Sequence, residues 1–401
     1  MTSEMLTARP HTSARAPVPP RSIPFARAVL TAEARAAADR ALASGWLTTG
    51  PEVASFEDEL AAFVGARRGV AVSSCTAALE LALRGLDLPA GARVLMSADT
   101  FCGAAAAIVH PGLVPVLADV DPVTAMPGTR EIRSAAVAAG GVDAMVVVHL
   151  GGAPTDVEAA ADAAQLPLDR VVEDGAHALG ASVRGRPVGA LSRATCFSFY
   201  ATKNLAVGEG GMVTTDDDDL ADTLQSTRLH GMSKDAWRRY LPGGSWRYDV
   251  RHDGLKANLT DVQAAVGRAQ LAAFPRHQER RAALAARYDA RLTGLDGIRR
   301  PPRTRLGTHA WHLYAVRVTP PFPIGRDELI ERLARRGIGT SVHFIPLHRL
   351  EWFARHCVLP PGGLPGADEV YAETLSLPFD QHLADDELDA VCDALWEEGV
   401  R

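Results

Sequence analysis

The sequence lacks the features that mark membrane, secreted and nucleic-acid-binding proteins. Nowhere in its 401 residues does an apolar run reach the roughly 18 residues that a membrane-spanning helix needs. The N-terminus has no apolar core of the kind found in secretory signals. The net charge is −6, without the basic excess typical of proteins that bind nucleic acid. We therefore expect a cytoplasmic protein that acts on neither membranes nor nucleic acids.

Cysteine is scarce, and aromatic residues make up only 6% of the chain. The cysteines form no CxxC pair and no regularly spaced set. A disulfide framework needs paired, regularly spaced cysteines, and a zinc site needs clustered ligands. We therefore expect free thiols in a reducing compartment and no metal site. The five cysteines are Cys75, Cys102, Cys196, Cys357 and Cys392.

What remains is the composition of a globular protein, with 47% apolar and 22% charged residues, which predicts a packed core. From about residue 30 to 270, short apolar runs alternate with Ala/Leu-rich stretches at helical spacing. Runs that are apolar on both faces are typical of strands buried between helices. The alternation predicts an α/β domain with a mostly parallel sheet. The seven predicted strands are 69–72, 93–97, 114–119, 144–150, 170–173, 194–199 and 211–214.

After residue 270 the pattern changes. Residues 270–295 are predicted to form one long helix. Strand-like segments at 309–318 and 339–344 follow, with helical patterns at 327–336 and 385–398. We therefore predict three parts. These are a disordered or loosely packed N-terminal tail (1–23), a large α/β domain (24–270), and a bridging helix with a small α+β domain (271–401).

Two short segments are candidates for ligand binding. The segment SSCTAAL at 73–79 follows a predicted strand and opens a helix, where backbone N–H groups and small hydroxyls suit an anion such as phosphate. An ordinary helix cap without a ligand is the alternative. The segment VVEDGAH at 171–177 ends a strand at Asp174, and ligands of open α/β sheets bind beyond the carboxyl ends of strands. A capping aspartate and a structural histidine at His177 are the alternatives.

A third segment, FSFYATKN at 197–204, places Lys203 among small and aromatic residues. A pyridoxal phosphate enzyme needs a lysine that forms a Schiff base with the cofactor aldehyde. It also needs a carboxylate that keeps the pyridine nitrogen protonated, a role that suits Asp174. Ser198 and the helix start at 73–79 suit the phosphate. A surface lysine is the alternative for Lys203 alone, but the three segments together favour a cofactor site.

A fourth segment, GLKANLTDVQAA at 254–265, is a loop that runs into a helix with a Thr or Asp cap. WLTTGP at 46–51, EGG at 209–211 and HFIPLH at 343–348 complete a set whose order and spacing are specific. The chain resembles the DegT/StrS family of nucleotide-sugar aminotransferases, which are pyridoxal phosphate enzymes of fold type I. The resemblance runs from about Trp46 to the C-terminus, nearly 90% of the chain.

The resemblance implies a large domain whose seven-stranded sheet lies between helices, and roles for individual residues. Lys203 is implied to bind the cofactor and move protons, Asp174 to pair with the ring nitrogen, and His177 to lie at the phenolic oxygen. The implied cofactor is pyridoxal 5'-phosphate. The other implied cofactor-binding residues are Thr76, Ala77 and Ser198 at the phosphate and Phe101 stacked on the ring. Asn258 is implied to enter the phosphate site of the neighbouring subunit, which predicts a homodimer with shared active sites.

The implied reaction moves an amino group from Glu or Gln to a keto sugar nucleotide, as in deoxyamino sugar or antibiotic biosynthesis. Residues 228–240 resemble members that act at C4 of dTDP- or UDP-4-keto-6-deoxyhexoses, which is the substrate we expect. C3 keto sugars and the keto-inositols that yield aminocyclitols are the alternatives within the fold. A non-catalytic regulatory homologue is disfavoured by the intact set of site residues. Candidate substrate residues are Arg238, Arg239 and His343, although a solvated basic patch is the alternative for the two arginines.

Several positions depart from the family pattern. Cys75 replaces the commoner Gly of its loop, and Gly175 replaces a commoner Ala. Gly151 stands where a Tyr is common, and Ala257 replaces a frequent aromatic residue. The changes at Gly151 and Ala257 should enlarge or dry the substrate pocket. They bear on its specificity rather than on the cofactor chemistry.

Overall fold

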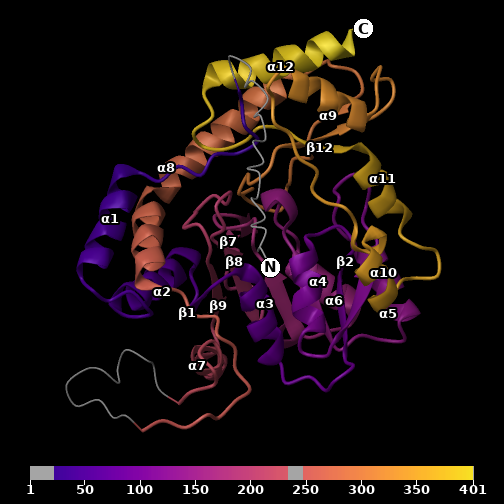
Figure 1. Cartoon of the computed structure of the whole chain (residues 1–401). Coiled ribbons are helices and arrows are strands. Elements are labelled where there is room, and N and C mark those ends of the chain that lie inside the picture. Colours follow the sequence, from indigo (N-terminus) through magenta and orange to yellow (C-terminus); the bar gives the residue numbers. More distant parts are fainter. Residues whose placement is uncertain (1–21, 234–246, 401) are drawn as a thin grey trace, which may run out of the picture.

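The computed structural model describes residues 22–233 and 247–400. Figure 1 shows a larger part built on a central sheet and a smaller part, joined by the long helix α8. The predicted substrate residues Arg238 and Arg239 lie outside the described residues, as do residues 1–21 of the predicted tail. Among the described residues, no helix is long and apolar enough to span a bilayer.

The seven strands of the central sheet lie where the sequence predicted them. Their order is β1-β9-β8-β5-β4-β2-β3. β8, β5, β4, β2 and β3 pair in parallel, whereas β9 is antiparallel to both β1 and β8. The predicted mostly parallel sheet of an α/β domain is therefore confirmed. The strands are β1 Arg68–Val72, β2 Arg93–Ser97, β3 Val114–Ala118, β4 Ala144–Val148, β5 Val171–Asp174, β8 Ala194–Ser198 and β9 Gly211–Thr215.

Helices cover both faces of this sheet because successive strand residues point to opposite faces. In β1, Val70 and Val72 belong to the apolar core that contains side chains of α3 and α4, whereas Ala71 belongs to the core that contains those of α2. All three are fully buried, as their apolar run predicted. One core contains residues of α2 (Pro51–Val64), α5 (Thr129–Ala138) and α6 (Val157–Ala164), and the other those of α3 (Cys75–Arg84), α4 (Cys102–Val109) and α7 (Asp218–Thr227).

Helix α8 spans Asp261–Arg291 and begins nine residues before the predicted start. Its N-cap is Thr260, whose Oγ1 accepts from the Gln263 backbone N–H at 3.3 Å. The Gln263 side chain accepts from the Thr260 N–H in return, which completes a capping box. The fourth segment therefore carries a Thr cap, one of its two predicted forms. The predicted domain boundary at residue 270 falls inside this helix.

The smaller part has a three-stranded antiparallel sheet, with β11 between β10 and β12. Two predicted strands differ from the structure. Only Ala315–Val318 of 309–318 forms a strand, and 339–344 forms a single bridge through Ser341. These segments pair elsewhere: Leu313 N–H donates to Gly151 and Phe344 N–H to Asp99. The bounds are β10 Ile298–Arg299, β11 Ala315–Val318, β12 Thr374–Ser376, α9 Arg326–Arg335 and α12 Asp385–Gly399.

The remaining elements frame these two parts. Helix α1 (Ala32–Ala43) lies beside α8 in Figure 1, and its Ala37 and Ala41 pack on Ala265. The core of the smaller part contains side chains of α8, α9, β11 and α12, and also Ile23, which is 3% exposed. The end of the predicted tail therefore packs against the C-terminal part. The other elements are β6 Ser182–Val183, β7 Arg186–Pro187, α10 Glu351–His356 and α11 Pro365–Glu373.

Candidate active site

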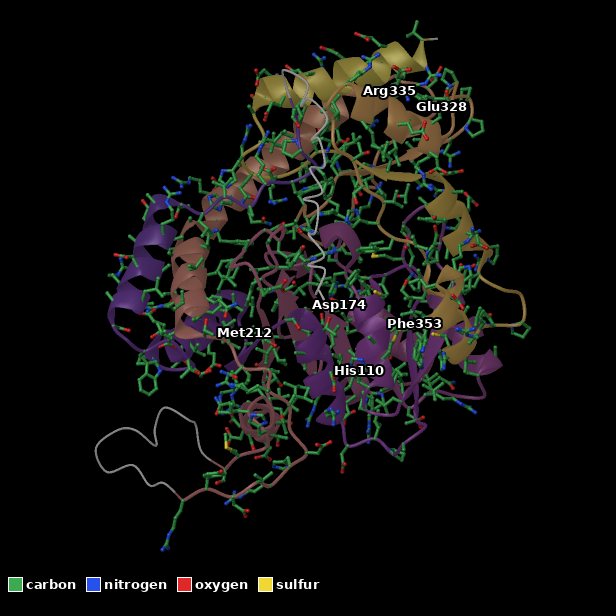
Figure 2. All side chains as sticks on the ribbon, in the orientation of Figure 1. His110, Asp174, Met212, Glu328, Arg335 and Phe353 are labelled. Carbon is green, nitrogen blue, oxygen red and sulfur yellow. The ribbon has the colours of Figure 1, made fainter. Side chains whose placement is uncertain are left out.

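A cavity of about 470 Å³ lies at the carboxyl ends of the parallel strands. Asp174 ends β5, Ser198 ends β8 and His149 follows β4, and all three line the cavity. The smaller part adds His343 to the wall. In Figure 2, Asp174 lies near the centre of the molecule, between the helices of the large part and the smaller part. This is the place where ligands bind in open α/β sheets.

Lys203 lies in the turn after β8 and lines the cavity. Burial lowers the pKa of Lys203 from 10.5 to about 8. The nearby Cys75 and Asp174 act in the other direction and raise this pKa, but by less than burial lowers it. Among the described residues, none forms a hydrogen bond or ion pair with its Nζ. A part of the lysine population is therefore neutral near pH 8. A neutral amine is the form that attacks an aldehyde.

Asp174 is a buried carboxylate with one oxygen free for a ligand. Its Oδ1 accepts from the Ala176 N–H at 3.1 Å and lies 3.8 Å from the Cys75 thiol. Its Oδ2 has no hydrogen-bond partner among the described residues. Burial raises the pKa of Asp174, while the Ala176 N–H and Lys203 oppose this rise. A protonated ring nitrogen at Oδ2 would offset the cost of burying this charge.

His177 faces the cavity with a fixed tautomer. Its Nδ1 accepts from the Gly151 N–H at 3.1 Å, so the proton of the neutral ring is on Nε2. Burial holds the pKa of His177 well below its ordinary value, and Lys203 and His343 lower it further. The ring lies 4.3 Å from that of His312, between ring centroids. His177 is therefore a neutral N–H donor at the cavity wall.

Helix α3 begins beside the cavity, as expected for an anion site. Thr76 and Ser198 line the cavity, whereas Ala77 does not. The Ala77 N–H donates to the side chain of the N-cap Ser74 at 3.1 Å. Ser198 Oγ accepts from the Tyr200 N–H at 3.3 Å. The structure therefore brings Thr76 and Ser198 together and gives the Ala77 N–H a partner within the helix cap.

Aromatic side chains form another wall of the cavity. Phe101 precedes α4, lines the cavity and is 57% exposed, so its ring is open to a ligand. Its centroid lies 5.8 Å from that of Phe344, which also lines the cavity. The predicted substrate residue His343 lies beside Phe344, and its Nδ1 is 2.8 Å from the Ser376 hydroxyl.

Asn258 does not line the cavity of its own chain. Its Nδ2 donates to Thr49 Oγ1 at 2.7 Å, and its Oδ1 accepts from Lys256 Nζ. Backbone pairing of Val72 with Asn258 holds this segment beside the end of β1. The implied role of Asn258 in the site of a second subunit stays a prediction.

Two histidines that line the cavity were not predicted from the sequence. His149 is fully buried, and its Nδ1 accepts from the Thr155 N–H at 3.0 Å. The proton on Nε2 therefore points to Glu173 Oε2, 2.9 Å away. His149 lies near the end of the predicted strand 144–150 and directly follows β4, so the strand-end rule applied to that strand could have found it.

His312 is the second missed histidine. The Asn204 amide donates to the Ala310 carbonyl at 2.8 Å, which leaves its Oδ1 as the acceptor for His312 Nδ1 at 3.0 Å. The Nε2 of the neutral His312 therefore carries a lone pair. Residues 309–314 were predicted as part of a strand, so no sequence signal placed this side chain in a site.

Comparison with known proteins identifies relatives over most of the chain. A family model described as the DegT/DnrJ/EryC1/StrS aminotransferase family matches residues 29–396. The spore coat polysaccharide biosynthesis protein SpsC of Bacillus subtilis is 44% identical over 88% of this chain and 91% of its own length.

Two solved structures are similar in both fold and sequence. Spr1654 of Streptococcus pneumoniae, described as belonging to the sugar aminotransferases, superposes in its PMP form with a TM-score of 0.86 at 29% identity, covering 94% of this chain and 99% of that one. It is also solved in a PLP form. DesI, solved in the presence of its TDP-sugar product, superposes with a TM-score of 0.81 at 32% identity, covering 94% of this chain and 93% of DesI. These similarities establish the fold of a type I pyridoxal phosphate transferase.

Pyridoxal phosphate is the cofactor of this family, and the cavity fits it. Asp174 Oδ2 offers a buried acceptor without a partner to the ring nitrogen. Lys203 Nζ offers an amine without a partner to the aldehyde, and the start of α3 with Ser198 offers donors to the phosphate. Phe101 is exposed on the cavity where a flat ring can stack.

Proposed function

The chain belongs to the DegT/DnrJ/EryC1/StrS aminotransferase family, and from that premise we propose that it transfers the amino group of Glu or Gln to a keto sugar nucleotide. The acceptor is C4 of a dTDP- or UDP-4-keto-6-deoxyhexose. The observation that carries the proposal is the convergence of Lys203, Asp174 and His177 on one cavity at the carboxyl ends of the strands. The TDP-sugar product of DesI supports the nucleotide-linked acceptor.

When bound, pyridoxal phosphate supplies an aldehyde that condenses with amines and a ring that accepts electrons from the substrate carbon. Lys203 provides the amine that holds it and then moves a proton at the substrate carbon through Nζ. The lowered pKa of Lys203, about 8, suits an amine that both gives and takes this proton near neutral pH. Asp174 Oδ2 binds the ring N–H and favours its positive charge. His177 orients the ring through its Nε2–H.

The acidic chain must gather positive charge locally to bind a nucleotide diphosphate. Lys203 is the only Lys or Arg among the described residues that line the cavity, and the proposed chemistry occupies it. We assign the diphosphate to Arg238 or Arg239, whose planar guanidinium suits phosphate oxygens. Asn258 serves a second subunit's phosphate site in a cytoplasmic homodimer, as the resemblance implies.

The cofactor assignment is tested by absorbance and chemical trapping. Purified wild-type enzyme should show the visible absorbance of lysine-bound cofactor, and borohydride should fix the cofactor to the peptide that contains Lys203. The Lys203→Ala variant should bind the cofactor reversibly and lose turnover by at least about a thousandfold, because it lacks both the amine and the proton carrier. A colourless Lys203→Ala protein that still aminates a keto sugar would contradict the mechanism.

The acceptor is tested by a substrate screen read by mass shift. dTDP- and UDP-linked 4-keto and 3-keto sugars, and a free keto-inositol, should each be incubated with Glu and with Gln. Transfer to the 4-keto-6-deoxyhexoses is the expected result. Turnover of the free keto-inositol with no need for a nucleotide would replace the proposed acceptor while leaving the cofactor chemistry intact.

A further inference from the structure

The first described residues form a strap across the smaller part of the molecule. The Ile23 N–H donates to the Gly337 carbonyl at 2.9 Å, and the Gly339 N–H donates to the Ile23 carbonyl at 2.8 Å. The Ile23 side chain is buried in the core of the smaller part. We name residues 23–27 the N-terminal strap. Its first residue is therefore fixed by both its backbone and its side chain.

The strap is also anchored beyond Phe25. The Phe379 N–H donates to the Phe25 carbonyl at 3.1 Å. The Arg27 N–H donates to Asp380 at 3.0 Å, and its guanidinium pairs with Glu387 through bonds of 2.6 and 3.0 Å. Anchors on both sides leave Phe25 little freedom to move away.

Gly339 allows the strap to approach this closely. A Cβ atom at Gly339 would lie 2.8 Å from the Phe25 backbone nitrogen, which is closer than real Cβ contacts come. The atom in the way belongs to the backbone, so a side chain at this position has to displace the strap. A substitution at Gly339 can therefore move Phe25 without changing any residue that lines the cavity.

Phe25 belongs to the aromatic wall of the active site. Both Phe25 and Ala26 line the cavity. The Phe25 ring lies 5.4 Å from the ring of His343, which in turn lies 4.8 Å from that of Phe344. The His343 Nδ1 contacts the Ser376 hydroxyl at 2.8 Å. His343 is therefore held between a hydroxyl on one element and the strap on another.

This wall suits an apolar part of a substrate. Phe25 presents only carbon atoms, so a sugar hydroxyl directed at it would lose its hydrogen bonds to water without replacement. Burial and the nearby Lys203 lower the pKa of His343 to about 4, so its ring is neutral near pH 7. Neutral aromatic rings pack well against C–H groups and gain from their removal from water.

We propose that Phe25 determines acceptor specificity by packing against the deoxygenated carbon of the sugar and by holding His343 at the cavity. The inference rests on the proposed aminotransfer to a keto sugar nucleotide. It adds to that function a residue from the N-terminal strap and a reason for preferring a deoxy sugar. The proposed contact is made by the acceptor sugar, whereas the amino donor is smaller than a sugar nucleotide.

The test compares full-length holoenzyme variants on two acceptors that differ in one hydroxyl. Wild type, Phe25→Ala, Phe25→Leu and Gly339→Ala are assayed with a 4-keto-6-deoxyhexose nucleotide and its 6-hydroxy counterpart. Phe25→Ala should raise KM for the deoxy acceptor about tenfold and reduce the kcat/KM preference for it by a similar factor, because an apolar contact is lost. Gly339→Ala should change the preference in the same direction, whereas Phe25→Leu should retain most of it.

Two measurements separate this contact from a general loss of structure. The half-reaction with glutamate, followed by cofactor absorbance, should lose less rate in Phe25→Ala than the half-reaction with the deoxy acceptor, because the proposed contact is made by the acceptor. Val29→Ala, an exposed residue two positions beyond the strap, should match wild type in every assay. An unchanged acceptor preference, or an equal loss in both half-reactions, would overturn the specificity role.

Failure of the proposed function would show itself differently. If wild-type enzyme aminates neither acceptor while its glutamate half-reaction proceeds, the proposed acceptor is wrong. The effect of Phe25 on His343 can then be tested without an acceptor, by an NMR titration that follows a ring proton of His343. Phe25→Ala should move the pKa of His343 up from about 4 towards 6.5, because the ring loses its cover, and Val29→Ala should not. An unmoved titration in Phe25→Ala would overturn the positioning role.

Discussion

Hydrogen bonds determine where the active-site histidines carry their protons. His177 accepts from the Gly151 N–H at Nδ1 and so presents a proton at Nε2, whereas His312 donates from Nδ1 and so presents a lone pair at Nε2. Burial lowers the pKa of both rings well below the ordinary value. The cavity therefore offers a fixed donor and a fixed acceptor near neutral pH. Gly151 supplies the backbone N–H that fixes the tautomer of His177. This role uses only the main chain, so it does not depend on the tyrosine side chain that is common at this position in the family.

Asp99 is a buried carboxyl whose ionisation should affect stability between acidic and neutral pH. It is 1% exposed, its Oδ1 accepts from the Phe344 N–H at 3.1 Å, and its Oδ2 has no partner. Burial raises the pKa of Asp99 from 3.8 to about 7. The folded state thus holds this proton more tightly than the unfolded chain. Stability attributable to Asp99 therefore falls as pH rises from about 4 to 7, by at most about 4 kcal/mol.

The Asp99→Asn variant removes this ionisation and retains an acceptor for the Phe344 N–H. Above pH 7 it should melt at a higher temperature than wild type, and the difference should vanish as the pH falls towards 4. Thermal scans at fixed rate between pH 4 and 8.5 measure this. Asp58→Asn, at an exposed position of α2, is the control and should follow the wild-type curve. A constant difference between Asp99→Asn and wild type across this range would contradict the assignment.

The sequence predicted which candidate side chains face the cavity better than it predicted their partners. Lys203 and Asp174 were proposed because each lies at or after the end of a strand-like run and has a residue type that the cofactor requires, and both line the cavity. Cys75 belongs to the segment predicted to bind an anion, and its thiol lies 3.8 Å from Asp174, a contact that the sequence did not predict. The direction of a side chain at the first turn of a helix depends on the packing of three elements. That packing is absent from the local pattern of residues.

At the scale of elements, the start of α8 is fixed by its capping box. Thr260→Ala removes the side-chain oxygen that accepts from the Gln263 N–H, and this should cost about 1 kcal/mol of stability. The Gln263 side chain also donates to the Glu209 carbonyl at 2.7 Å, and Glu209 lines the cavity. Loss of the cap should therefore loosen one edge of the active site as well.

Apparent melting temperature and cofactor retention on dialysis measure the two effects of Thr260→Ala. Thr260→Ser keeps the hydroxyl and should restore both. If Thr260→Ser lost as much stability as Thr260→Ala, the threonine methyl group rather than the cap would be responsible.

The elements of the central sheet could be predicted because burial on both faces leaves continuous apolar runs in the sequence. In the smaller part this signal fails. The strand β12 has only three residues, and backbone N–H groups within residues 310–313 of the predicted strand 309–318 donate to the carbonyl groups of Gly151 and Gly152 in the large part instead of extending the sheet. Residues 339–344 have a strand-like pattern, yet the Phe344 N–H donates to a side chain at the end of β2. Tertiary contacts of this kind override a short local pattern.

At the scale of the whole molecule, α8 joins the two walls of the cavity. Its buried Arg281 donates to the carbonyl groups of Trp311 and His312 at 3.0 and 3.3 Å, and burial lowers the pKa of this arginine to about 10. On its outer side, Arg280 and Arg287 of α8 pair with Asp385 and Asp389 of α12. The bridging helix therefore fixes the smaller part against the segment that carries His312.

A single chain brings together Lys203, Asp174 and His177 but leaves Asn258 outside its own cavity. If Asn258 serves the site of a second subunit, Lys203→Ala and Asn258→Ala homodimers should each be inactive, while a hybrid dimer has one site with both residues intact. Random exchange of equal amounts should then restore about a quarter of wild-type activity. Mixing Lys203→Ala with Asp174→Ala is the matched control, because both residues lie in the cavity of one chain and every hybrid site would lack one of them. Exchange is verified by mass spectrometry of differently tagged subunits. No recovery for the Asn258→Ala pair under verified exchange, or equal recovery for the Asp174→Ala pair, would contradict a shared active site.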